Sequence, residues 1–261
     1  IGYGTFKSTD GGDERLIHMA LDAGYRLLDT AAFYGNEEFV GKAVKESGIG
    51  REDIFITTKV WKMELGYDRT KASVEQSLKH LQTDYVDLCL IHWPKPEPET
   101  ENWKELDAGS WKALEELCRQ GKVRAIGVSN FLPPHLEALM EHAEILPAVN
   151  QLEIHVGYTQ EAAVSYCKEH GIQVQAWSPL GRRRVLEEPA VIRIAAKYGV
   201  SPAQILLKFL LSQGIAVIPK SSSMNRMKEN LDLPELEISK EDLYFLRCLP
   251  QTGWGGEHPD L

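Results

Sequence analysis

Short apolar segments alternate with amphipathic segments along the whole chain. The apolar segments end in turn residues and predict buried strands at residues 2–6, 25–29, 54–59, 85–91, 123–128, 148–151, 172–177 and 215–218. Between them, apolar residues recur at helical spacing. This pattern predicts helices at residues 13–23, 36–45, 68–81, 110–120, from 133, from 159, 189–198, from 201, 224–231 and 239–248.

Several helix ends carry recognisable capping residues. Gly24 is expected to close the first helix, and Asn36, Asp68 and Thr159 are expected to cap or begin later ones. Ser201 is followed by proline at the first helical position and by glutamine two residues later, which predicts a capping box. The polar segment 95–107 is expected to be an insert that precedes its helix.

Eight strands that alternate with helices favour one architecture. Strands buried on both faces of a parallel sheet are continuous apolar runs, as they are here. We therefore expect an α/β fold, a single-domain (β/α)8 TIM barrel that spans residues 1–261. No linker rich in proline, glycine or serine divides the chain.

Composition excludes several classes of partner. With 43% hydrophobic and 26% charged residues, the chain has the makeup of a globular protein, and its net charge of −9 disfavours nucleic acid and anionic membranes. No transmembrane span and no signal peptide are indicated. The four cysteines lack metal or disulfide spacing, which favours a cytoplasmic location without a structural metal. We expect a monomer, because no large apolar surface is evident.

Polar side chains gather where the predicted strands end. Asp29 closes the second strand and Tyr34 lies in the following loop, while Lys59 and His92 stand at the ends of the third and fourth strands. In a (β/α)8 barrel, catalytic residues lie at these carboxyl ends. Each residue also has a structural interpretation: Asp29 and Lys59 as a buried ion pair, His92 bonded to a carbonyl, and Tyr34 packed at the rim. The four together favour an active site.

The motifs around these residues resemble those of the aldo-keto reductases. DTAAFYGNEE contains Asp29 and Tyr34, TTKVW contains Lys59, and LIHWP contains His92. GVSNF, VNQLEIH, AWSPLG and IPKSSSMNRMKEN extend the resemblance over essentially the whole chain. Within the family, the chain looks most similar to the prokaryotic branch of diketogluconate reductases and prostaglandin F synthase-like enzymes.

This resemblance implies NADPH-dependent reduction of an aldehyde or ketone without a metal. Tyr34 would be the general acid, its pKa lowered from about 10 by Lys59, and Asp29 would keep Lys59 charged. His92 would orient the substrate carbonyl and stabilise the developing alkoxide. Trp61 and Trp93 would form an apolar wall for the substrate, although Trp93 can also be ordinary packing.

The same resemblance assigns the cofactor contacts, and no GxGxxG motif indicates a Rossmann site instead. Ser129, Asn130 and Gln151 would hold the nicotinamide carboxamide, and Trp177 would stack on the ring, where a core role is the alternative. The remaining positions implied to contact the cofactor are Ser178, Leu180, Gly181, Lys220, Ser221, Arg226, Glu229 and Asn230. Of these, Lys220, Ser221 and Arg226 would hold the adenosine 2′-phosphate. Two cations near one phosphate favour NADPH over NADH, and the alternative is a solvated basic loop.

Three features depart from the family pattern. The N-terminal hairpin of many relatives is absent, so we expect further residues before Ile1. The loop after the seventh strand is short and contains Arg182–Arg184, which either reaches the cofactor pyrophosphate or is solvated. The glycine-rich segment 253–258 either lines the substrate pocket or is a frayed tail.

Two other functions remain open from the residues. A lyase would use Lys59 as a Schiff-base amine. A nucleotide-binding subunit would keep the barrel without turnover, which the four polar residues at the strand ends argue against.

Overall fold

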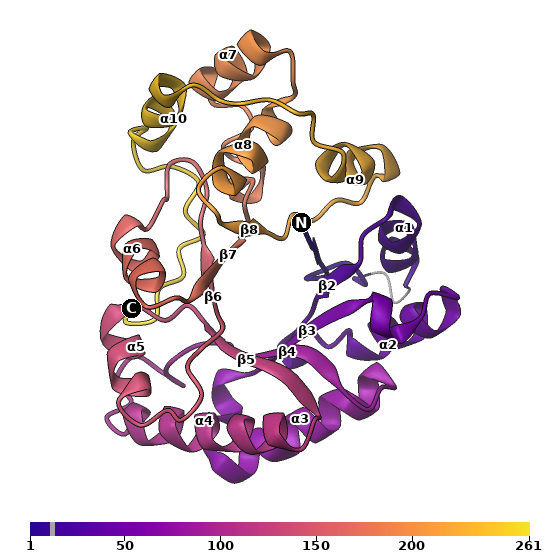
Figure 1. Cartoon of the computed structure of the whole chain (residues 1–261), viewed down its shortest axis with the longest axis vertical. Coiled ribbons are helices and arrows are strands. Elements are labelled where there is room, and N and C mark those ends of the chain that lie inside the picture. Colours follow the sequence, from indigo (N-terminus) through magenta and orange to yellow (C-terminus); the bar gives the residue numbers. More distant parts are fainter. Residues whose placement is uncertain (11–13) are drawn as a thin grey trace.

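Eight parallel strands form a ring in the computed structural model, which describes residues 1–10 and 14–261 (Figure 1). The strands, each paired with the next in chain order, are β1 (Tyr3–Gly4), β2 (Leu27–Asp29), β3 (Phe55–Val60), β4 (Val86–Ile91), β5 (Val123–Ser129), β6 (Val149–Glu153), β7 (Gln173–Trp177) and β8 (Ala216–Val217). Backbone hydrogen bonds from Gly2 N to Val217 O (2.8 Å) and from Gly4 N to Pro219 O (3.1 Å) link the first strand to the last. The expected (β/α)8 barrel is confirmed.

The helices lie outside this ring (Figure 1). They are α1 (Arg15–Ala23), α2 (Glu37–Glu46), α3 (Tyr67–Leu81), α4 (Trp103–Arg119), α5 (Pro133–Met140), α6 (Glu161–Glu169), α7 (Pro189–Tyr198), α8 (Pro202–Leu211), α9 (Met224–Leu231) and α10 (Lys240–Arg247). The predicted first residue of the first helix, Asp13, lies outside the described residues. None of the helices within the described ranges is both long and apolar enough to cross a bilayer.

Two predicted helix ends are confirmed in detail. Gly24 adopts the left-handed conformation with φ 108° after α1, and its N–H bonds the carbonyls of Ala20 and Leu21. Ser201 and Gln204 form the reciprocal capping box at the start of α8, with Pro202 at the first helical position.

Other predicted caps are wrong. Gly66, not Asp68, precedes α3, and α6 begins at Glu161 rather than at Thr159. Asn36 precedes α2 but makes no capping bond, because its side chain is used elsewhere. Its Oδ1 accepts from Thr30 Oγ1 at 2.6 Å and its Nδ2 donates to Thr5 O at 2.9 Å, which joins the segments after β1 and β2.

The predicted polar insert 95–107 is also shorter than expected. Helix α4 begins at Trp103, because Trp103 and Leu106 continue its apolar face toward α5 and the core. The Trp103 ring meets the His135 ring edge-on, with centroids 5.1 Å apart. Cys89 is a buried free thiol, whereas Cys118 is only partly buried.

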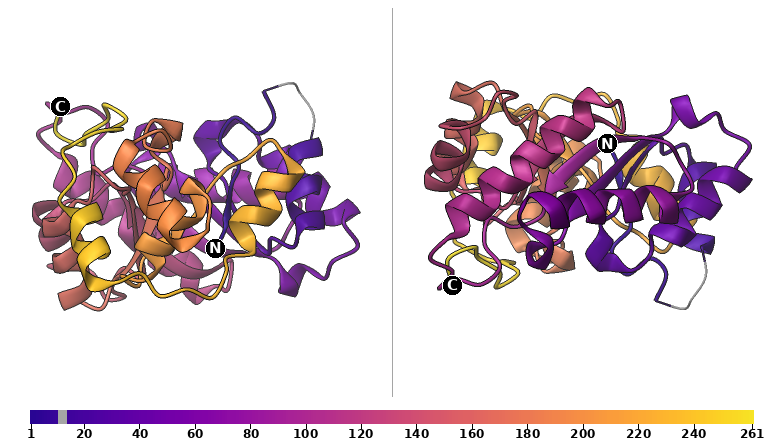
Figure 2. Two further views of the ribbon diagram at one scale, coloured as in Figure 1. Left: turned by 90° about the horizontal axis from the view of Figure 1, so that it is seen from above. Right: turned by 90° about the horizontal axis from the view of Figure 1, so that it is seen from below.

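The two ends of the barrel differ. The N-terminus lies at the end of the barrel where the strands begin, and the C-terminal segment lies at the opposite end (Figure 2). Parallel pairing aligns Asp29 with Thr57 and Ser129 with Gln151, so that the carboxyl ends of these strands lie at the same end of the barrel. The polar residues that follow the apolar strands are thereby brought to one mouth.

Candidate active site

The four residues expected at the mouth meet around the amine of Lys59. Lys59 Nζ donates to Asp29 Oδ1 at 2.6 Å, to the carbonyl of Thr30 at 2.9 Å and to Tyr34 Oη at 3.3 Å. Asp29 and Lys59 come from neighbouring strands, and Tyr34 ends a 3₁₀ turn, Ala32–Tyr34, that directly follows β2. The ion pair and the phenol are therefore one hydrogen-bonded group and not separate features.

Lys59 is a buried ammonium. Burial alone would lower its pKa, but the Asp29 carboxylate and Tyr34 outweigh burial, so that the pKa of Lys59 is raised above its ordinary value. Its side chain is 0% exposed and that of Asp29 is 2% exposed, so this ion pair is shielded from salt.

Tyr34 departs from the expectation for its acidity. Burial of the hydroxyl is the largest influence and raises its pKa, Lys59 lowers it, and Asp29 raises it again; the net pKa is above the ordinary value. Lys59 lowers the pKa of Tyr34 as expected, but burial, which sequence alone did not reveal, outweighs this effect. The phenol therefore carries its proton at neutral pH.

His92 directly follows β4 and is buried among aromatic rings. Its ring centroid lies 5.7 Å from that of Tyr34 and 5.2 Å from that of Trp61, both edge-on. Burial, and then the charge of Lys59, hold the pKa of His92 well below its ordinary value. Nδ1 of His92 has no hydrogen-bond partner among the described residues. A neutral imidazole thus lies beside the phenol.

An aromatic wall extends from this group toward solvent. Trp61 stacks on Phe33 with ring centroids 3.8 Å apart, and Phe6 packs on Tyr34 at 4.9 Å. Phe33 is 52% exposed, which is unusual for a large apolar side chain with a stacking partner. Phe6 and Phe33 were not among the residues predicted for the site, although the position of Phe33 directly before Tyr34 could have indicated its role. Trp93 lies elsewhere in the mouth, in a cavity lined also by Asn130, Tyr158 and Glu257.

The residues expected to hold the nicotinamide form a connected network with these groups. Trp177 Nε1 donates to Asn130 Oδ1 at 2.9 Å, and Asn130 Nδ2 donates to the carbonyl of His92 at 3.0 Å. Gln151 Nε2 donates to Asp29 Oδ2 at 2.6 Å, while Ser129 Oγ donates to the carbonyl of Gln151 at 2.8 Å. The structure therefore joins the two predicted sets of residues.

The segment after β7 contains unusual backbone. Ser178 and Arg182 have φ values of 48° and 50°, Asn130 after β5 has 63°, and none of the three is glycine. Such left-handed residues cost roughly 1–2 kcal/mol each and gather at functional sites. Gly181 at φ 53° lies in the same turn, and an added Cβ there would come within 2.9 Å of Val185. Leu180 packs partly against the core.

The residues predicted to grip a phosphate follow β8. Arg226 Nε lies 3.4 Å from Ser221 Oγ, so these two donors are together. Lys220 Nζ donates to the carbonyl of Lys7 at 3.0 Å, which links the segments that follow the neighbouring strands β8 and β1. Glu229 is partly buried and Asn230 fully buried, both on α9.

The C-terminal segment is packed at the carboxyl ends of β6 and β7 and is not frayed, while its role in lining a substrate pocket stays a prediction. Gly255 N donates to Glu153 Oε1 at 2.9 Å, and the Trp254 ring stacks near Tyr158 with centroids 6.0 Å apart. Arg182 Nη2 pairs with Glu257 Oε2 at 2.9 Å, and Arg184 Nη1 donates to the carbonyl of Trp254 at 2.7 Å. Two of the three arginines therefore contact the tail.

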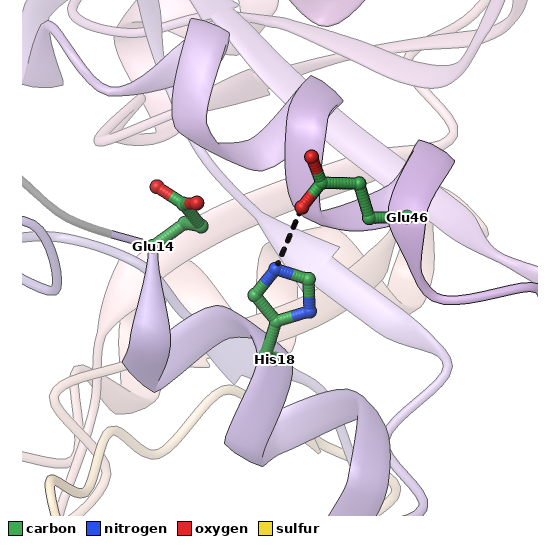
Figure 3. A group of neighbouring side chains, drawn as sticks. All are labelled: Glu14, His18 and Glu46. Carbon is green, nitrogen blue, oxygen red and sulfur yellow. Dashed lines mark ion pairs between the residues drawn. The ribbon is translucent and has the colours of Figure 1, made fainter.

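One group of possible metal ligands lies away from the mouth, on α1 and α2 and the residue before α1. Glu14, His18 and Glu46 have ligand atoms within 4.8 Å of one another (Figure 3). Glu14 Oε1 is already paired with Lys42 Nζ at 2.6 Å, and His18 Nε2 lies 3.5 Å from Glu46 Oε2. The arrangement is a surface ion-pair cluster on the helical layer.

Comparison with known proteins identifies the family to which this barrel belongs. Residues 1–247 match the sequence profile of the Aldo/keto reductase family. The chain is 45% identical to the glyoxal reductase of Bacillus subtilis, over 100% of this chain and 92% of that protein. It is 38% identical to methylglyoxal reductase DkgA of Escherichia coli, again over 100% and 92%.

A solved structure of a Bombyx mori aldo-keto reductase in complex with NADP matches with a TM-score of 0.86 and 33% identity. The match covers 95% of this chain and 87% of that one. The chain therefore belongs to the aldo/keto reductase family, whose enzymes use nicotinamide cofactors, and the relatives agree with the expected diketogluconate reductase-like branch.

Proposed function

We propose that this enzyme reduces a small aldehyde or ketone to the alcohol with NADPH. The observation that carries the proposal is the contact of Lys59 Nζ with both Asp29 Oδ1 (2.6 Å) and Tyr34 Oη (3.3 Å) beside the ring of His92. Bound NADPH supplies the hydride to the carbonyl carbon. The side chains of the mouth must then supply the proton.

Tyr34 is the proposed proton donor. Its phenol is protonated at neutral pH because burial raises its pKa. As negative charge develops on the substrate oxygen, that oxygen takes the phenolic proton and becomes the hydroxyl of the product. The phenolate that remains is stabilised by the ammonium of Lys59, which Asp29 keeps charged and directed at Tyr34.

His92 is the proposed hydrogen-bond donor to the substrate oxygen. Because its pKa is held well below the ordinary value, the imidazole is neutral, and one ring N–H can point to the carbonyl without losing its proton. A fixed donor aimed at a developing alkoxide is worth about 3–4 kcal/mol in related chemistry.

The raised pKa of Lys59 disfavours the lyase alternative. A Schiff base forms only from a neutral amine, and the amine here is held as an ammonium by a buried carboxylate 2.6 Å away.

The donor set at the mouth fits a nicotinamide dinucleotide. Ser129, Asn130 and Gln151 offer a hydroxyl and two amides around Trp177 for the nicotinamide. The strained turn after β7, with Ser178, Leu180 and Gly181, offers close backbone approach for the pyrophosphate. Lys220, Ser221 and Arg226 offer two cations and a hydroxyl for the 2′-phosphate, with Glu229 and Asn230 nearby on α9.

The wall of Trp61 and Phe33 offers the substrate apolar contact, and Trp93 lies in a cavity that polar side chains such as Asn130 and Glu257 also line. Because two relatives are named for glyoxal and methylglyoxal, we propose that short dicarbonyls are among the substrates.

The test is consumption of NADPH by the purified chain, followed by its absorbance, with methylglyoxal, benzaldehyde and a keto-sugar. We expect turnover with at least the dicarbonyl. Tight NADPH binding without turnover across the panel would contradict the proposal. Covalent trapping of substrate on Lys59 by borohydride, without NADPH consumption, would support the lyase instead.

A further inference from the structure

The arginine run after β7 is the feature that the proposed function does not yet explain. Arg182, Arg183 and Arg184 follow the turn proposed to approach the cofactor, yet their surroundings differ. Arg184 bonds a neutral carbonyl, that of Trp254. The guanidinium of Arg183 makes no ion pair with any described residue. Within the described residues, Arg182 is the one of the three that pairs with an anion, Glu257 of the tail.

Arg182 also stands next to two positions proposed to contact the cofactor. Its guanidinium carbon lies 5.6 Å from the ring centroid of Trp177, and it follows Gly181 directly in the chain. Its Nη2 would come within 3.0 Å of a Cβ added to Gly255, so that the tail passes closely over the guanidinium. A cation placed here can reach a diphosphate bound at the turn.

Glu257 is held in place by contacts that do not involve Arg182. On one side, Gly255 N is bonded to the buried carboxylate of Glu153 at 2.9 Å. On the other side, Asp260 accepts from Lys95 and lies 3.2 Å from His135 Nε2. The chain on both sides of Glu257 is therefore anchored at the mouth by contacts that do not depend on Arg182.

The Arg182–Glu257 pair is itself exchangeable. The side chains are 37% and 52% exposed, and partly solvated pairs of this kind contribute little net stability. A diphosphate carries more charge than one carboxylate and accepts the planar guanidinium in bidentate fashion. Exchange of one anion for the other is therefore favourable.

We propose that Arg182 binds the pyrophosphate of the cofactor and that Glu257 is its counter-ion in the empty enzyme, competing with the cofactor for the guanidinium. The inference rests on the proposed use of NADPH. It adds a binding residue, and it makes the C-terminal tail a determinant of cofactor affinity.

The experiment is a double-mutant cycle on NADPH affinity, measured by isothermal titration calorimetry without substrate. Calorimetry avoids tryptophan fluorescence, which Arg182 itself perturbs at Trp177. Glu257→Gln frees the guanidinium and is expected to tighten NADPH binding about three-fold. Arg182→Gln is expected to weaken it about ten-fold. Arg183→Gln is the matched control in the same run and is expected to change affinity less than two-fold.

The double variant separates the specific effect from general charge. If Glu257 acts through Arg182, adding Glu257→Gln to Arg182→Gln leaves NADPH affinity unchanged. An equal gain in both backgrounds would mean that Glu257 merely repels an anionic cofactor, and it would overturn the proposal. So would a lack of response to Glu257→Gln in the otherwise unaltered protein.

Two further outcomes are distinguishable. If Glu257→Gln leaves NADPH affinity unchanged but lowers KM for 4-carboxybenzaldehyde and not for 4-nitrobenzaldehyde, Arg182 serves an anionic substrate, and the proposal is wrong. If the unaltered protein does not bind NADPH at all, the proposed function fails before the competition between Glu257 and the cofactor is tested.

Discussion

At the scale of single residues, burial outweighs the neighbouring ammonium at Tyr34, whereas the contacts with Asp29 and Tyr34 together outweigh burial at Lys59. Tyr34 and Lys59 contact each other, yet the pKa of the phenol is raised, since the same burial that strengthens their attraction also penalises the phenolate. A neutral acid next to a fixed cation suits a step in which the proton leaves only as the alkoxide forms.

Burial acts on another carboxyl group with no catalytic role. Asp107 on α4 is 2% exposed, and neither of its oxygens has a hydrogen-bond partner among the described residues. Burial raises its pKa well above the ordinary value, and the charge of Lys95 only partly opposes this shift. Folding therefore favours the protonated form, so the fold loses stability as pH rises from the unfolded pKa, about 4, through the folded pKa.

We predict that Asp107→Asn raises the free energy of unfolding at pH 7 by about 1–3 kcal/mol, because a buried charge is replaced by a neutral amide of the same shape. The gain should vanish below about pH 4, where Asp107 is protonated in both states. Urea unfolding at the two pH values measures both effects. The exposed Asp84→Asn is the control and should stay within about 0.5 kcal/mol. Loss of stability at pH 7 would show that Asp107 is ionised and paired.

At the scale of elements, the type and order of the segments follow from the hydrophobic pattern, but their ends depend on tertiary contacts. Helix α4 begins at Trp103 because its first turns pack against α5, which no local signal encodes. The Asn36 side chain does not cap α2 because its amide is hydrogen-bonded to Thr5 and Thr30 instead. The strands β1 and β8 are shorter than their apolar runs, although the hydrogen bond from Gly4 N to Pro219 O continues their pairing beyond β8.

The site residues on regular elements were predictable for a related reason. A strand end has one place in a barrel, so Asp29, Lys59 and His92 had to converge. Residues that reach the mouth from the far end of the chain, such as Glu257, leave no such signal. Their position depends on the path of the tail after α10, which is set by contacts with β6 and the β7 turn.

The preference for NADPH over NADH is predicted to depend on Arg226, near the start of α9. Arg226 lies 3.4 Å from Ser221, and we predict that Arg226→Ala weakens NADPH binding about ten-fold or more and NADH binding less than two-fold, because only NADPH has the 2′-phosphate. Lys228→Ala removes an exposed cation from the same helix and is the control. Equal losses for the two cofactors in Arg226→Ala would contradict the assignment.

At the scale of the whole molecule, the barrel brings three sets of residues to one end. The ring of strands places three sets of residues at the carboxyl ends of the strands: the catalytic residues around Tyr34, the Ser129–Gln151–Trp177 network, and the tail. Hydrogen bonds join the first two sets directly. A substitution in one of these two sets is therefore expected to change the hydrogen bonding of the other. Asp29, for example, accepts from both Lys59 and Gln151.

The central claim is that one proton, from Tyr34, is needed for the chemistry and not for cofactor binding. The most direct measurement is Tyr34→Phe, with NADPH affinity and steady-state reduction of methylglyoxal determined on the same preparation. We predict a loss of kcat of at least about 100-fold, with NADPH affinity within about two-fold of the unaltered protein. Tyr67→Phe, which removes a phenol that bonds Glu116 between α3 and α4, should leave both values unchanged. Substantial turnover in Tyr34→Phe would contradict the account.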